Sequence, residues 1–181
     1  MPDIDAERRF TALYEAHQSQ VYAYAVSRTG RQVADEVVSE TFMVAWRRFA
    51  ELPSSPLPWL LGVARNVIHE QARSARSQES LAAELRAWAT PQDHASADPS
   101  EVVIERDALR SALSRLGEDD RELLTLVAWH GLTTAQAAEV IGCSSATFFV
   151  RLHRARQRLE SALHEVPAPR YTYIQGKDAV R

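Results

Sequence analysis

A glycine set between two helix-forming segments constrains the fold of this chain more than any other feature. The threonines at 133–134 can cap a helix start, and residues 135–141 then carry apolar side chains at helical spacing. Gly142 follows, at the position where helices most often end in glycine. The serines at 144–145 can cap a second, longer helix that is rich in arginine. This pattern predicts a helix-turn-helix, whose second helix normally enters the major groove of DNA. An ordinary helical hairpin with a solvated basic face is the alternative interpretation.

The composition indicates a globular chain and gives no sign of a catalytic or metal site. Its 181 residues, 45% hydrophobic and 25% charged, allow one large domain or two small ones. Cys143 is the only cysteine, which excludes an internal disulfide, and the six histidines show no metal-ligand spacing. Because no nucleophile–base pair or phosphate-binding loop is present either, we predict neither an enzyme nor a cofactor. No apolar run is long enough to span a bilayer and no signal peptide is evident, so we expect a cytoplasmic protein without membrane insertion.

Arginines are concentrated in three stretches although the net charge of the chain is −3. These stretches are residues 47–48, 65–76 and 151–158, whereas acidic residues gather near the N-terminus, in the middle and at residues 117–122. Basic stripes on an acidic background can bind phosphate groups locally while the whole chain binds DNA weakly. The charge pattern therefore predicts a nucleic-acid binder that acts together with a partner.

Helical periodicity runs through both halves of the chain, and no alternation typical of strands is present. In the first half, Gly30 and a proline-rich loop at 52–58 separate three amphipathic segments, with Pro58 as the expected first residue of the third helix. Trp46 and Trp59 lie on the apolar stripes of these segments, so we expect both in the core. The predicted fold class is all-α, with two small helical domains joined by a flexible linker.

The domain boundaries follow from a segment in which the helical pattern weakens and Ser, Ala, Gln, Asp and Pro dominate. We place the first domain at residues 1–76, an acidic linker at 77–99, the second domain at 100–166 and a C-terminal tail at 167–181.

Two separated blocks of sequence carry a resemblance to a known family. The first consists of VADEVVSETFMVAWRRF followed by PWLLGVARNVIHEQARSAR, and the second is ALSRLGEDDRELLTLVAWHGLTTAQAAEVIGCSSATFFVRLHRARQRLESAL. They resemble regions 2 and 4 of the extracytoplasmic-function (group 4) sigma factors of bacterial RNA polymerase. The blocks cover most of residues 10–163 in the order of the family, with its linker between them. The resemblance implies a transcription initiation factor that binds core RNA polymerase through the β′ clamp helices and β flap, recognises promoter DNA and helps to melt it.

The resemblance also implies roles for residues in the first domain. The acidic and apolar stretch of its second helix would dock on the polymerase, with the candidates Asp35, Glu36, Val38, Glu40 and Arg47. The alternative is that the acids form only a solvated helix face. Asn66 matches the family position near the pocket for a flipped base of the −10 element, where an amide can offer both a donor and an acceptor. Arg65, Arg73 and Arg76 would then hold the DNA backbone.

In the second domain the arginine-rich helix would read the −35 element. The candidates are Ser145, Thr147, Phe149, Val150, Arg151, His153 and Arg154. Phe149 and Val150 depart from the family, in which many members have a basic residue and a serine here, and neither side chain can bond guanine in a bidentate manner. If they face DNA, apolar contact with thymine methyl groups is the chemistry left to them. A buried Phe149 is the alternative, but a turn of about 100° per residue points it away from Phe148, so we expect exposure.

Other functions and partners stay open at this stage. A one-component regulator would use the N-terminal helices for ligand binding or dimerisation and would bind a palindromic site without polymerase. A protein-interaction adaptor would use the basic helix on acidic partners. Members of the family are commonly held inactive by an anti-sigma factor that covers both DNA-binding domains. The linker would either thread towards the active-site cleft of the polymerase or serve as a simple tether.

Overall fold

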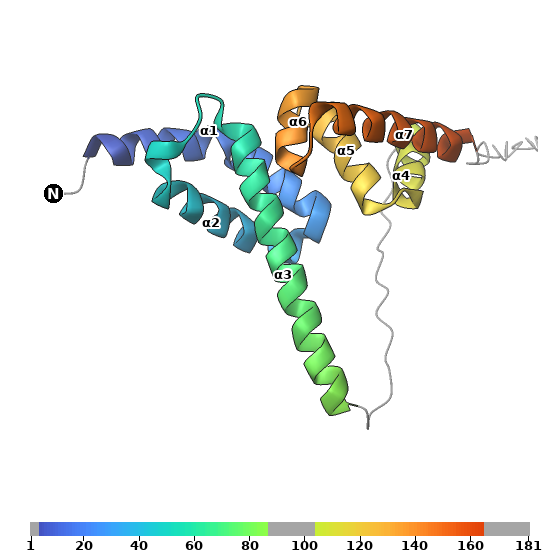
Figure 1. Cartoon of the computed structure of the whole chain (residues 1–181), viewed down its shortest axis with the longest axis horizontal. Coiled ribbons are helices and arrows are strands. Elements are labelled where there is room, and N and C mark those ends of the chain that lie inside the picture. Colours follow the sequence, from blue (N-terminus) through green and yellow to red (C-terminus); the bar gives the residue numbers. More distant parts are fainter. Residues whose placement is uncertain (1–3, 87–103, 165–181) are drawn as a thin grey trace, which may run out of the picture.

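The computed structural model describes residues 4–86 and 104–164, and every regular element in these ranges is a helix. The all-α fold with two helical domains is therefore confirmed. The elements are α1 (Ile4–Thr29), α2 (Arg31–Arg47), the short 3₁₀ helix η1 (Phe49–Glu51), α3 (Pro56–Arg86), α4 (Ile104–Arg115), α5 (Glu118–Ala128), α6 (Thr134–Ile141) and α7 (Ser145–His164) (Figure 1). None of these helices is long and apolar enough to cross a membrane.

The first domain is formed where α1, α2 and α3 bury their apolar stripes against one another. α1 ends at Thr29 because Gly30 adopts φ 77°, a left-handed conformation that lets the chain reverse into α2. α2 buries Val37, Phe42 and Ala45. Trp46 departs from the prediction: its ring packs edge-on against Phe10 at 4.9 Å, yet 46% of the residue is exposed. It therefore lies at the edge of the core rather than within it.

The third helix is longer at both ends than the sequence predicts. It begins at Pro56, two residues before Pro58, because the N–H groups of a first helical turn need no helical acceptor and both prolines fit there. It continues to Arg86, so residues 77–86 of the predicted linker are helical, and the C-terminal half of α3 extends away from the other helices (Figure 1). Residues 87–99, the rest of that linker, and the tail at 167–181 lie outside the described residues.

The second domain contains the predicted helix-turn-helix. Thr133 caps α6 in a reciprocal capping box, in which its hydroxyl accepts from the Gln136 N–H at 3.3 Å and its own N–H donates to the Gln136 side chain at 3.0 Å. Gly142 ends α6 at φ 75°, and the Ser144 hydroxyl accepts from the Thr147 N–H at 3.1 Å at the start of α7. Phe148 and Leu152 bury one side of α7. The local sequence signals thus produced the expected geometry.

The two domains also pack against each other. α6 lies beside the N-terminal half of α3 (Figure 1), and a β-carbon added to Gly62 of α3 would lie 4.0 Å from the Cα atom of Val140 in α6. Buried side chains of both helices, among them Leu61 and Ala137, belong to one continuous hydrophobic cluster. The free chain is therefore described in a closed arrangement with a shared core, which the pattern of two domains on a linker did not predict.

Two glycines of opposite conformation provide a test of this fold. Gly142→Ala should lower the free energy of unfolding by about 1 kcal/mol, because a β-carbon is strained in the left-handed conformation. Gly62→Ala should instead raise it by about 0.5–1 kcal/mol, since alanine favours a helix interior and the added carbon only reaches ordinary contact with Val140. Urea unfolding followed by circular dichroism measures both. Equal effects of the two substitutions would contradict the assigned geometry.

Candidate nucleic-acid interface

The exposed side of α7 carries most of the residues predicted to read the −35 element. Ser145, Thr147, His153 and Arg154 are exposed. Phe149 is 63% exposed while its neighbour Phe148 is fully buried, so the predicted orientation of Phe149 is confirmed. Val150 is exposed beside it. Phe149 and Val150 thus form a small exposed apolar patch near the start of α7, which makes them candidate contacts on this helix.

The arginines of α7 are not equally available. Arg151 approaches the exposed Asp119 carboxylate at 3.8 Å, a surface pair that solvent weakens. Arg158 donates to the Asp120 carboxylate at 2.6 Å. Both acids come from the first turn of α5. They therefore link α5 to α7 and neutralise part of the basic side of α7. Arg158 was not among the predicted contacts, although the acidic run that starts α5 was a visible signal of such pairing.

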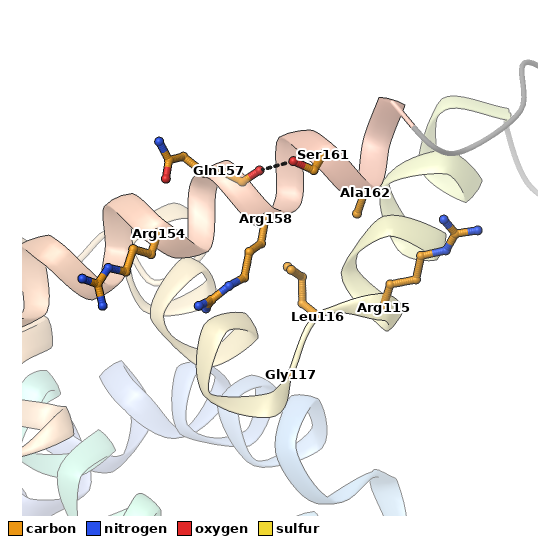
Figure 2. A pocket seen from close by; sticks show the side chains of 8 residues that line it. All are labelled: Arg115, Leu116, Gly117, Arg154, Gln157, Arg158, Ser161 and Ala162. Atoms are coloured by element: carbon orange, nitrogen blue, oxygen red, sulfur yellow. Dashed lines mark hydrogen bonds between the residues drawn. The ribbon is translucent and has the colours of Figure 1, made fainter.

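A cleft beside α7 shows how these side chains are arranged. It is lined by Arg115 at the end of α4, by Leu116 and Gly117 between α4 and α5, and by residues of α7 (Figure 2). Arg154 and Arg158 project from the same side of α7, one turn apart, whereas Gln157 projects from the other side and its carbonyl accepts from the Ser161 hydroxyl at 3.0 Å. The basic side of α7, on which Arg154 is exposed, suits contact with the phosphate backbone of DNA.

The residues predicted to bind the −10 element lie on α3 but do not share one environment. Asn66 is exposed and lines a groove of about 720 Å³ together with Trp59, the segment between η1 and α3, and Gln136 and Glu139 of α6. Arg73 and Arg76 are exposed farther along α3, where Arg73 pairs with Glu70 at 3.3 Å. The groove is large enough for a small-molecule-sized group.

Arg65 lies instead in a buried polar cluster between the domains. Its Nε donates at 3.1 Å to a carboxylate oxygen of Glu122 in α5, and the same oxygen accepts from the Tyr24 hydroxyl at 2.5 Å. Arg28 approaches the second carboxylate oxygen at 3.6 Å. Glu122 is only 2% exposed. Burial and then the Glu122 carboxylate raise the pKa of Tyr24, so its hydroxyl remains a donor.

The residues predicted to bind polymerase lie on α2 and divide into two groups. Asp35, Glu36 and Arg47 are exposed and Glu40 is partly exposed, so these charges are accessible on the described surface. Val38 is only 8% exposed and packs in the hydrophobic cluster, where it supports the helix from within. The exposed side chains of Met43 and Trp46 add apolar surface to the same helix. Trp46 was predicted to lie in the core, and Met43 was not among the predicted contacts.

Models of two protein families match the chain. The model described as Sigma-70 region 2 matches residues 13–78, and the model described as Sigma-70, region 4 matches residues 106–159. The first match covers most of α1, α2 and the first part of α3, and the second covers the helices from α4 to α7. The two matches therefore coincide with the two packed domains.

Two curated relatives align with most of this chain and with nearly their own whole length. The ECF RNA polymerase sigma factor SigL of Mycobacterium tuberculosis is 31% identical over 163 residues, which is 88% of this chain and 91% of that protein. The ECF RNA polymerase sigma factor SigM of Bacillus subtilis is 29% identical over 151 residues, which is 82% of this chain and 91% of that protein.

Two solved structures share the fold at 24% sequence identity. One is the sigma factor RpoE of Bartonella quintana in complex with the anti-sigma factor NepR, with a TM-score of 0.67 over 88% of this chain and 99% of that chain. The other is CnrH in complex with the cytosolic domain of CnrY, with a TM-score of 0.60 over 87% of this chain and 89% of that chain.

His130 gives a pH-dependent test of the interface between the domains. The residue is buried, its ring lies 5.8 Å from the Tyr24 ring, and burial lowers its pKa below the ordinary 6.5. The unfolded chain therefore takes up more protons than the folded chain as pH falls below 6.5, and stability should be lost as pH falls towards the lowered pKa. The thermal midpoint should drop between about pH 7.5 and 5.5, and His130→Phe should reduce that drop.

His69 adds a dependence of the same sign, because burial and then Arg65 lower its pKa. The exposed His153 provides the control, and His153→Gln should leave the drop unchanged. A full drop in His130→Phe would show that this histidine is not buried as described.

Proposed function

The chain belongs to the ECF family of RNA polymerase sigma factors, and from this premise we propose that it directs core RNA polymerase to a set of promoters. It would bind the polymerase, recognise the −35 and −10 elements and promote melting of the DNA. The observation that carries the proposal is the second helix of a capped helix-turn-helix, α7, which leaves Phe149, Val150 and Arg154 open to solvent in the domain matched by region 4.

Recognition of the −35 element would fall to α7. Thr147, Phe149 and Val150 lie near the N-terminus of the helix, the part that contacts base edges in helix-turn-helix proteins. Arg154 follows on the basic side and would contact phosphate. Apolar side chains at the reading positions favour thymine, whose methyl group is the apolar feature of the major groove.

Recognition and melting of the −10 element would fall to α3 and the groove beside it. The Asn66 amide at the edge of that groove could bond a base that has left the stack, since its edge is accessible only in single-stranded DNA. Arg73 and Arg76, both exposed on the same helix, would hold the backbone of that strand.

Polymerase would bind the outer side of α2, where Asp35 and Glu36 are exposed and the apolar Met43 and Trp46 lie nearby. Charged groups around an apolar centre are the usual make-up of a protein interface. The β′ clamp helices and β flap are the proposed contacts. The polymerase supplies the chemistry, so the chain itself would not be an enzyme, and it would act in the cytoplasm with the polymerase.

An anti-sigma factor is a further proposed partner. Of the two solved structures that share the fold, one is a complex with an anti-sigma factor and the other is a complex with the cytosolic domain of CnrY. The alternative of a one-component regulator has no support among the relatives, which are polymerase sigma factors.

Run-off transcription with purified core polymerase tests the proposed function. The template is the DNA upstream of the chain's own gene. We expect a transcript that appears only when the chain is added. Binding of the chain alone to a palindromic site, with no transcript and no polymerase contact, would overturn the proposal.

Phe149 provides a test of promoter recognition by α7. In the complex with polymerase, wild-type chain should prefer A·T over G·C at the contacted −35 position by roughly fivefold, through contact with a thymine methyl group. Phe149→Ala should remove most of this preference. Arg154→Ala should weaken binding to all sequences alike and reduce the salt dependence, since it is proposed to contact phosphate. Affinity is measured by titration of promoter duplexes that differ at single base pairs. Wild-type binding that is indifferent to the base at every −35 position would contradict the role of Phe149.

A further inference from the structure

One acidic side chain of the second domain is bound by polar groups that all belong to the first domain. The acceptor is the Glu122 carboxylate of α5, and it is the only buried acidic side chain in the described part of the chain. The Tyr24 hydroxyl at 2.5 Å and the Arg65 guanidinium at 3.1 Å donate to one carboxylate oxygen, and the Arg28 guanidinium forms an ion pair with the other oxygen at 3.6 Å. Arg28 also donates to the Glu118 backbone carbonyl at 3.2 Å. All donor groups in these polar contacts between the domains therefore belong to the first domain.

The donors are held in place by the first domain itself. Tyr24 and Arg28 lie one turn apart on α1, and Arg65 faces them from α3. The Tyr24 ring is fully packed in the core, and the side chains of Arg28 and Arg65 are only 12% and 19% exposed. Two guanidinium groups beside a hydroxyl form a receptor for an oxyanion, because guanidinium binds carboxylate and phosphate oxygens in fixed geometry.

Glu122 fills this receptor incompletely. Its second carboxylate oxygen and the Nε of Arg28 are buried, and neither has a hydrogen-bond partner among the described residues. A buried ion pair loses the hydration of both charges, so an imperfect pair gains little over the separated state. A phosphate group carries the same kind of charge with more acceptor oxygens, and it can satisfy donors that a carboxylate leaves unused.

The receptor adjoins the surface proposed for the −10 element. Arg65 immediately precedes Asn66, which lines the groove beside α3. In the closed arrangement α6 forms the other wall of that groove with Gln136 and Glu139. The second domain therefore fills the receptor and also borders the surface around Asn66.

We propose that Tyr24, Arg28 and Arg65 form a phosphate-binding site for single-stranded promoter DNA, and that Glu122 occupies this site from within the chain until the domains part. The inference rests on the proposed function, because the DNA strand that would replace Glu122 in this site is the promoter strand that the proposed function requires. Closure and binding of the strand exclude each other, and the carboxylate acts as an internal competitor of the phosphate.

Binding of a fluorescent single-stranded 20-mer of mixed sequence to the full chain without polymerase tests the proposal. Glu122→Gln keeps the size of the side chain and its ability to accept from Tyr24 but removes the competing charge. It should bind the strand about tenfold more tightly than wild type at low salt, since a hydrogen-bonded charge is lost from the closed state. Glu118→Gln is the matched control, because it removes the same charge from an exposed side chain one turn earlier on α5. It should stay within about twofold of wild type.

Removal of the receptor should cancel the gain. Adding Arg28→Gln and Arg65→Gln to Glu122→Gln should return the affinity to the wild-type value or below it. Adding Arg8→Gln and Arg31→Gln, which removes two exposed charges elsewhere on α1 and α2, should preserve most of the gain. An unchanged affinity of Glu122→Gln, or a gain that survives loss of Arg28 and Arg65, would overturn the proposal.

A second measurement needs no substitution. The radius of gyration of the wild-type chain alone, measured by small-angle neutron scattering at the solvent contrast that matches out DNA, should increase when the chain is saturated with the 20-mer, because the strand can reach the receptor only in the open form. An unchanged radius at saturation would overturn the proposal. Run-off transcription separates this result from failure of the proposed function: a transcript with no change in radius rejects the receptor alone, whereas loss of the transcript in wild type rejects the sigma-factor function.

Discussion

The buried carboxylate of Glu122 is the interaction on which the arrangement of the two domains depends. A buried charge costs several kcal/mol unless it is paired, so α5 can approach α1 only where Tyr24, Arg28 and Arg65 meet it. When the domains separate, water hydrates both halves of this cluster. The cluster therefore determines how the two domains are oriented in the closed state but contributes little net stability to it. The stability of the closed state comes from the apolar contact between α3 and α6.

α3 connects this arrangement with the proposed function. One side of the helix packs in the first domain, another contacts α6, and the exposed remainder carries Asn66, Arg73 and Arg76. A helix that serves both as domain interface and as a candidate DNA surface links the two roles physically, because movement of the second domain changes what α3 exposes. The side of α7 proposed to read the −35 element is exposed in the same closed arrangement. The candidate DNA surface on α3, by contrast, adjoins the domain interface.

Features governed by neighbours in sequence were predicted well. The caps around Gly142 lie within a few residues of one another, and the exposure of Phe149 follows from helical spacing alone. The pairing of Arg65 with Glu122 was missed, because 57 positions separate the residues and Glu122 belongs to an acidic run that resembles a solvated helix start. Trp46 was misplaced because an apolar stripe does not show where a core ends. The individual DNA and polymerase contacts remain predictions.

The central claim is that the free chain is closed through Glu122 and that the domains must part before single-stranded DNA reaches Tyr24, Arg28 and Arg65. The most direct measurement is the distance between spin labels at Gln32→Cys on α2 and Gln157→Cys on α7, both exposed positions, in a chain whose natural cysteine is replaced by Cys143→Ser. Double electron–electron resonance should give one narrow distance distribution for the free chain and a longer distance when the chain is saturated with the single-stranded 20-mer. A broad distribution in the free chain, or the same distance in both states, would contradict the account.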